Sequence, residues 1–151
     1  MEKLAVERGI WIAAPRERVW HAITDPAQVE KWFSPGTKWR GSGLQVGGRL
    51  YVPNAETGAE MYVQVIEVVD PPHRFVTRSE PEPPATPEVT TWTLEEENGG
   101  TRLTLTYTGY ELMPEDIRLR NMEQNAFGFG MMLENLQAHV EGRSLPYPQG
   151  F

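Results

Sequence analysis

The last third of the chain carries a helical pattern of apolar residues. They recur at alternating steps of three and four, at Leu119, Met122, Ala126, Phe129, Leu133, Leu136 and Val140. This spacing places them along one side of a helix. Pro114 suits the first turn, because a proline there gives up no hydrogen bond, and Gly142 suits the C-terminal stop. The pattern therefore predicts one long helix from about Pro114 to Glu141.

Two glycines lie inside this predicted helix. Gly128 and Gly130 each cost roughly 1 kcal/mol of helix stability relative to alanine. Glycines at such positions indicate the close approach of another backbone or of a ligand. The helix could be interrupted near Asn121 or Gly128.

Most of the remaining chain alternates between apolar and polar residues, as strands do. The predicted strands are residues 4–12, 44–46, 49–52, 61–69, 74–79, 89–96 and 101–108. Asn98-Gly99, between the last two, is a strong hairpin signal.

Two short helices follow the first strand. One starts at Pro15 and runs to about Thr24, and the other has Asp25 as its N-cap. The proline-rich segment 80–88 is expected to be a surface loop.

Alternation also predicts which side chains face inward. Trp92 and Leu94 share one face of their strand, and Leu103, Leu105 and Tyr107 share one face of the next. Both faces of the strand 61–69 are mostly apolar. For its inner face we choose Tyr62, Gln64, Ile66 and Val68.

These elements predict an α+β fold. The simplest way to bury the helical stripe is to lay the helix across a curved antiparallel sheet. The chain has 151 residues, enough for one domain with a sizeable core, and shows no internal repeat. We therefore expect a single domain over residues 1–151.

Composition narrows the classes of function. Hydrophobic residues make up 39% and charged residues 23%, as in ordinary soluble proteins, and no apolar run is long enough to span a bilayer. The charged, alternating N-terminus is unlike a secretory signal, so a cytoplasmic location is expected. Without cysteine, the chain has no disulfide, thiolate metal site or cysteine nucleophile. The net charge of -7 argues against nucleic-acid binding, which needs clustered Lys and Arg.

The polar residues form no recognisable catalytic motif. His21, His73 and His139 lack the spacing of a zinc-binding helix, so we expect surface histidines and no metal site. The few serines lie outside any nucleophile-elbow motif. The glycine pairs at 47–48 and 99–100 precede no helix and are read as a bend and a turn, not as phosphate loops. No catalytic residue and no cofactor are therefore predicted.

Several segments, in this order and spacing, carry a resemblance to a known family. Residues 12–26 read IAAPRERVWHAITDP and are followed by Trp32-Phe33. Further matching segments are 46–49 (VGGR), 65–68 (VIEV) with Pro71-Pro72, 100–103 (GTRL), 128–129 (GF) and 133–136 (LENL). Together they resemble the START-like (SRPBCC) superfamily, in particular the branch of the heat-shock-protein-ninety ATPase activator homologue domain. The family usually has tryptophan where Phe129 stands.

The resemblance implies a helix-grip fold, in which a curved sheet wraps around a long C-terminal helix with a cavity between them. It implies no single activity, because the superfamily includes lipid carriers, hormone receptors, cyclases and chaperone partners.

The aromatic and methionine residues are the candidate ligand contacts. Core packing accounts for most of them, but some are expected to line the cavity, where methionine offers an adaptable surface and aromatic rings offer flat ones. Gln64 is the candidate polar group, since a buried amide needs a partner. The predicted ligand-binding residues are Trp39, Gln64, Trp92, Phe129 and Met132.

The function expected from these features is non-catalytic binding of a small, mainly apolar molecule. The first alternative is a chaperone-binding module, as the resemblance suggests. The second is a cyclase-type enzyme, against which the missing acid–base constellation counts.

Overall fold

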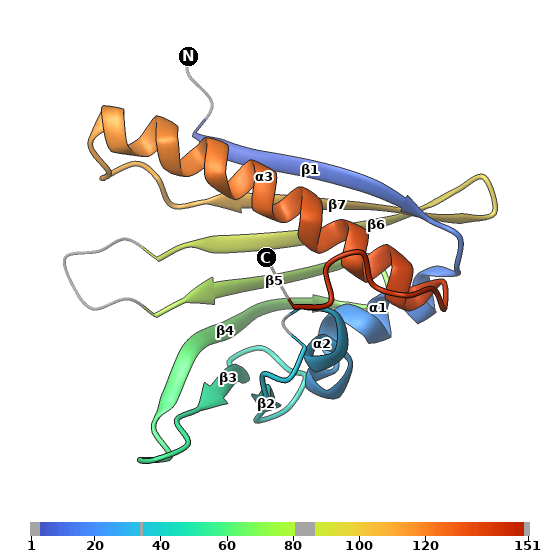
Figure 1. The fold of residues 1–151 in the computed structure, drawn as a ribbon, viewed down its shortest axis with the longest axis horizontal. Helices are drawn as coiled ribbons and strands as arrows, with labels where there is room; N and C mark the ends of the chain where they lie inside the picture. The colour runs from blue at the N-terminus through green and yellow to red at the C-terminus, as the bar shows by residue number, and fades with distance from the viewer. Residues whose placement is uncertain (1–3, 34, 81–86, 150–151) are drawn as a thin grey trace.

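The computed structural model describes residues 4–33, 35–80 and 87–149 (Figure 1). The elements of this part of the chain are β1 Ala5–Ile12, α1 Arg16–Thr24, α2 Pro26–Trp32, β2 Arg40–Gly41, β3 Arg49–Pro53, β4 Glu60–Asp70, β5 Arg74–Ser79, β6 Val89–Glu97, β7 Gly100–Thr108 and α3 Glu115–Val140. The proline-rich segment predicted as a surface loop falls largely on residues 81–86, outside the described residues.

The strands form one antiparallel sheet in the order β1-β7-β6-β5-β4-β3-β2. Helix α3 lies along one side of the curved sheet, where it makes its most extensive contacts with β1, and α1 and α2 pack near its C-terminal end (Figure 1). This arrangement confirms the predicted α+β helix-grip fold. None of the helices in the described residues is long and apolar enough to cross a membrane.

The two short helices form where their capping residues predict. Helix α1 begins directly after Pro15 and buries Val19, Trp20 and Ile23. Asp25 then caps α2, and its Oδ1 accepts a hydrogen bond of 3.0 Å from the Ala27 amide. The hairpin between β6 and β7 also forms as predicted. Asn98 and Gly99 both adopt positive φ angles, of 50° and 79°, as a tight two-residue turn requires.

The predicted strand 44–46 is wrong, and the second strand is β2 at Arg40–Gly41 instead. Residues 42–48 form a loop in which Gly43 and Gly47 have positive φ angles that extended strands do not use. The loop also forms a backbone hydrogen bond within itself, from the Gln45 amide to Gly43 O. Val46 is 68% exposed, so its apolar character does not mark a buried strand.

The inner face of β4 was predicted only in part. Gln64 lines the space above the sheet and Ile66 is buried, but a bulge between Ile66 and Val68 shifts the register against β5. The extra residue places Val69 opposite Phe75 and against the core. Val68 therefore takes the other face, contrary to the prediction, because simple alternation does not hold across a bulge.

Helix α3 confirms the predicted long helix, from Glu115 to Val140 without interruption at Asn121 or Gly128. Leu133 and Leu136 are buried in the core. The start of the predicted stripe is not buried, because Leu119 is 47% exposed. The first turns of α3 extend past the start of β1, and none of the described segments packs over them (Figure 1).

Candidate functional site

A cavity of about 560 Å³ lies between the concave face of the sheet, α2 and α3. Its walls come from elements far apart in the sequence, and most of its side chains are aromatic or aliphatic. The lining residues are Ile23, Pro26, Val29, Trp32, Phe33, Thr37, Trp39, Leu50, Tyr62, Gln64, Phe75, Thr77, Thr90, Trp92, Leu105, Tyr107, Phe129 and Met132.

The structure brings all five predicted ligand-binding residues to the wall of this cavity. Trp39 comes from the segment after α2, Gln64 from β4, and Trp92 from β6. Phe129 and Met132 come from α3, on the helix face that looks onto the sheet. Their position is thus the one expected, while their role toward a ligand remains a prediction.

Aromatic rings hold one side of the cavity in a fixed arrangement. Trp32 meets Trp92 edge-on, with ring centroids 6.4 Å apart, and meets Phe33 at 5.8 Å. Phe33 in turn contacts Trp39 at 5.7 Å. Trp32 is further anchored because its indole Nε1 donates to Ala22 O over 2.8 Å. Edge-to-face contacts of this kind stabilise ring positions, so the wall is preorganised.

The floor of the cavity consists of cross-strand rows with different chemistry. Phe75, Trp92 and Leu105 are register partners on β5, β6 and β7 and form an apolar row. Two residues further along each strand, on the same face, Thr77, Thr90 and Tyr107 are also register partners and form a polar row. We call the second set the hydroxyl row.

Hydrogen bonds already occupy part of the hydroxyl row. The Thr77 hydroxyl donates to Gln64 Oε1 over 3.2 Å. The Tyr107 hydroxyl donates to the Glu88 carboxylate, which lies just beyond the row. Burial, and then this hydrogen bond, raises the pKa of the Tyr107 phenol well above its usual range. Tyr107 therefore stays protonated at neutral pH.

Tyr107 also joins the hydroxyl row to α3. Its ring lies 5.1 Å from that of Phe129 and 5.8 Å from that of Tyr110. The Tyr110 hydroxyl accepts a hydrogen bond of 2.7 Å from Asn125 Nδ2, and burial raises the pKa of this phenol too. Of these two neutral phenols, Tyr107 lines the cavity and Tyr110 packs against it.

Sequence reasoning missed several wall residues. Thr77, Thr90 and Tyr107 were not among the predicted contacts, although Tyr107 was assigned to the inner face. Thr90 lies two residues before Trp92, so the alternation that places Trp92 inward also places Thr90 inward. The period-two pattern could therefore have found the hydroxyl row, had small polar residues been weighed beside large apolar ones.

The two helix glycines have different surroundings. A Cβ atom at Gly130 would lie 2.6 Å from Arg8 Nη2, whereas one at Gly128 would meet no described atom within 4 Å. Arg8 packs over α3, and its Nη1 donates to Ala126 O over 2.6 Å. The close approach predicted for these glycines thus occurs only at Gly130, and the partner is a side chain from β1 rather than a backbone or ligand.

The match to a family model covers residues 13–141, most of the chain. The model is that of the activator of Hsp90 ATPase homolog 1-like protein. The chain belongs to this family. No match was found among the curated proteins.

Solved structures of other proteins share the START-like fold of this chain. Protein MLL2253 from Mesorhizobium loti is 24% identical, covers 93% of this chain and 99% of its own, and superposes with a TM-score of 0.70. CalU16 from Micromonospora echinospora is 24% identical over 90% of this chain and 75% of its own, with a TM-score of 0.66. An HSP90 activator from Plasmodium falciparum is 19% identical over 71% and 74%, with a TM-score of 0.58. At these identities the similarity shows the fold alone.

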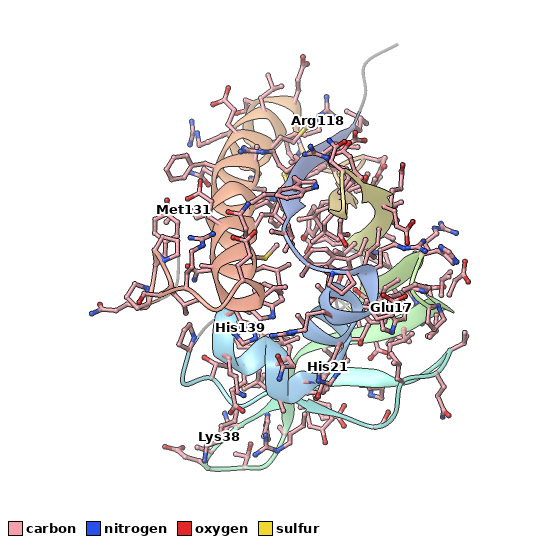
Figure 2. All side chains as sticks on the ribbon, turned by 90° about the vertical axis from the view of Figure 1, so that its right-hand side faces the viewer. Glu17, His21, Lys38, Arg118, Met131 and His139 are labelled. Atoms are coloured by element: carbon pink, nitrogen blue, oxygen red, sulfur yellow. The ribbon has the colours of Figure 1, made fainter. Side chains whose placement is uncertain are left out.

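In this member of the activator-homologue family, the histidines lie outside the cavity wall. His139 differs from the surface position predicted for it: it lies at the end of α3, half-buried against α2, with Nε2 2.8 Å from Gln28 Oε1 (Figure 2). Burial, with Arg18 and Lys31 nearby, lowers its pKa. Within the described ranges, no three His, Asp or Glu side chains are grouped so as to hold a metal ion.

Proposed function

We propose that this protein binds a small, mainly apolar molecule in the cavity between the sheet, α2 and α3. The observation that carries the proposal is the cavity itself. Its volume of about 560 Å³ lies within the range typical of small-molecule sites, roughly 300–1,000 Å³. Its walls combine flat aromatic rings with Met132, whose flexible thioether adapts to a ligand's shape.

The chemistry of the walls favours binding without catalysis. No charged side chain occurs among the described lining residues, so the cavity has no acid–base pair of the usual kind. A cyclase-type reaction would have to rely on shape and neutral hydroxyls. We place the binding activity in the cytoplasm, as the sequence predicts.

Titration with an uncharged fluorescent probe tests the proposal. N-phenyl-1-naphthylamine brightens in apolar surroundings, so it should saturate at one site per chain. A ligand that binds only the folded state adds about 2.7 kcal/mol to the free energy of unfolding when its free concentration is a hundred times Kd. The melting temperature should rise accordingly. Extraction of the purified protein, followed by mass spectrometry, would then identify any natural ligand that copurifies.

Phe129→Trp, with Phe127→Trp as its control, locates the site. Both residues lie on α3, but Phe129 lines the cavity and Phe127 is 71% exposed. The larger ring at position 129 should fill the cavity and weaken probe binding about tenfold or more, with little change in melting temperature. The same ring at position 127 should leave probe affinity unchanged.

The opposite result would count against a cavity beside Phe129. If Phe129 only fills the core, tryptophan should overpack it and lower the stability by roughly 1–3 kcal/mol. Unchanged probe affinity with a marked drop in melting temperature would therefore contradict the proposed site.

A second candidate function is binding to a chaperone. Family membership supports it, and so do the exposed apolar side chains Ile117 and Leu119 on the first turns of α3. Leu119→Asp should then weaken binding to heat-shock protein ninety, while Phe129→Trp should not. The reverse pattern, or no binding at all, would leave the cavity as the functional part of the molecule.

A further inference from the structure

We infer that the ligand is uncharged and carries an oxygen group, a hydroxyl or a carbonyl, which it places against the hydroxyl row of Thr77, Thr90 and Tyr107. The inference rests on the proposed function, because it names the class of molecule that the same cavity accepts. Three observations support it: the order of polarity along the floor, the hydrogen-bonding atoms left open there, and the charges around them.

Polarity rises along the floor in one direction. The row formed by Leu94 and Leu103 is fully buried. The apolar row of Phe75, Trp92 and Leu105 follows, and then the hydroxyl row, about 7 Å further on, since two strand residues rise about 3.3 Å each. A ligand that fills this space therefore lies with its apolar part on Trp92 and one end against the hydroxyls.

The hydroxyl row retains capacity for further hydrogen bonds. Gln64 Oε1 accepts from Thr77, but Gln64 Nε2 and the Thr90 hydroxyl have no hydrogen-bond partner among residues 4–33, 35–80 and 87–149. Tyr107 gives its proton to Glu88 and keeps lone pairs that can accept. The amide and the threonine can thus donate to a ligand oxygen, and Tyr107 can accept from a ligand hydroxyl. A pure hydrocarbon would leave these groups without a partner, which costs binding energy.

The charges around the row disfavour a carboxylate ligand. The described lining holds no Lys or Arg that could pair with one. The Glu88 carboxylate is bonded to Tyr107 of this row, and the chain as a whole has a net charge of -7. A desolvated anion without a counter-ion is strongly unfavourable. The neutral form of an amphiphile therefore fits this cavity, and its carboxylate counterpart does not.

Three matched naphthalene compounds test the inference by equilibrium dialysis at pH 7. 2-Naphthol is neutral and carries a hydroxyl, 2-naphthoate carries a carboxylate, and naphthalene carries neither. We expect 2-naphthol to bind at least tenfold more tightly than 2-naphthoate, and more tightly than naphthalene.

Variants of the row identify the atoms involved. Thr90→Val should weaken 2-naphthol about two- to tenfold, the range of one hydrogen bond, and leave naphthalene unchanged. Thr91→Val is the matched control, because the next residue on β6 points to the opposite face. Glu88→Gln should strengthen 2-naphthoate several-fold without changing naphthalene.

The outcomes separate this inference from the proposed function. Equal binding of 2-naphthol and 2-naphthoate, or equal effects of Thr90→Val and Thr91→Val on 2-naphthol, would overturn the inference while leaving apolar binding intact. If neither these compounds nor N-phenyl-1-naphthylamine binds, the proposed function is wrong, and the inference falls with it.

Discussion

The two halves of α3 carry the same stripe of apolar residues but have different surroundings. In the C-terminal half, Leu133, Asn135, Leu136 and Ala138 are all buried, although they point to different sides of the helix. In the N-terminal half, Ile117, Leu119 and Phe127 are exposed. The C-terminal half is therefore enclosed on most sides, with Glu134 left exposed, and the N-terminal half is far less covered.

The enclosing layer of the C-terminal half is the segment that follows the helix. This segment turns back at Gly142, whose φ angle is positive, and runs along the helix toward α2 (Figure 1). Its Arg143 amide donates to Ala138 O over 2.8 Å, and Leu145 packs against the core. Among the described residues, no such segment covers the N-terminal half, and Figure 2 shows the first turns of α3 at the edge of the molecule.

The difference shows that a helical stripe marks a side of a helix but not how much of it is buried. Burial depends on what the fold places opposite each turn. The cavity lies under the middle of α3, at Phe129 and Met132, where the two kinds of surroundings meet. The enclosed half thus anchors the helix, and the ligand site begins where the anchoring ends.

The sharpest test of this comparison replaces one leucine by alanine in each half of the helix. Leu136 is fully buried, so Leu136→Ala should lower the free energy of unfolding by roughly 2–5 kcal/mol. Leu119→Ala, at a position 47% exposed, should cost less than about 0.5 kcal/mol, as surface changes usually do. Denaturant unfolding measures both. Similar losses in the two variants would show that the halves are equally buried in solution.

The next largest effect is expected at Asn135, which joins the helix to its covering segment. Asn135 Nδ2 donates to Trp32 O over 3.1 Å and to Tyr147 O over 2.9 Å, and its Oδ1 accepts from the Tyr147 amide at 2.9 Å. Asn135→Ala leaves these backbone groups unpaired, so a loss of about 2–4 kcal/mol is expected.

Asn121→Ala serves as the control for this variant. The Asn121 amide donates to Ile117 O in its own helix and, over 3.4 Å, to the Met113 sulfur just before it, and alanine favours the helical state. We expect a change below about 1 kcal/mol in thermal unfolding. A comparable loss at both asparagines would mean that the covering segment contributes little.

The features predicted correctly from sequence are those that short segments determine by themselves. Asp25-Pro26 caps α2, Asn98-Gly99 forms the hairpin, and the three-four spacing predicts α3 to within a residue or two. Each depends on the conformational preferences of a few neighbouring residues. The cavity was expected from the family resemblance, which is how Trp92 and Met132 were chosen.

The features that sequence reasoning missed depend on distant neighbours. The bulge that moves Val68 to the outer face arises from the pairing of β4 with β5, which alternation along one strand does not contain. Leu119 is exposed because none of the described segments packs over it. Glu88 approaches Tyr107 because β6 and β7 are neighbours, so this contact becomes visible only once the register is known.

The two helix glycines should respond differently to alanine. Gly128→Ala fills open space and removes a poor helix former, so we expect a gain of roughly 0.5–1 kcal/mol. Gly130→Ala displaces Arg8 and its hydrogen bond to Ala126 O, which should cancel that gain. In an Arg8→Ala background, Gly130→Ala should stabilise the protein as Gly128→Ala does. Additive effects of Arg8→Ala and Gly130→Ala would contradict this contact.

An effect of similar size concerns the residue directly after α3 and depends on pH. Glu141 caps α3, and its Oε2 accepts a hydrogen bond of 2.8 Å from the Ala13 amide, at the end of β1. This bond, aided by Arg143, lowers the pKa of the Glu141 carboxyl below its ordinary value of 4.5. Because the folded state favours the ionised form, the stabilisation is fully present above pH 4.5 and is lost as the pH falls through the lower folded-state pKa.

Glu141→Gln should therefore cost about 1 kcal/mol at pH 7, the scale of one hydrogen bond, and progressively less toward pH 3. Urea unfolding across this range measures it. A difference between the two proteins that stays constant down to pH 3 would show that the carboxylate does not tie α3 to β1.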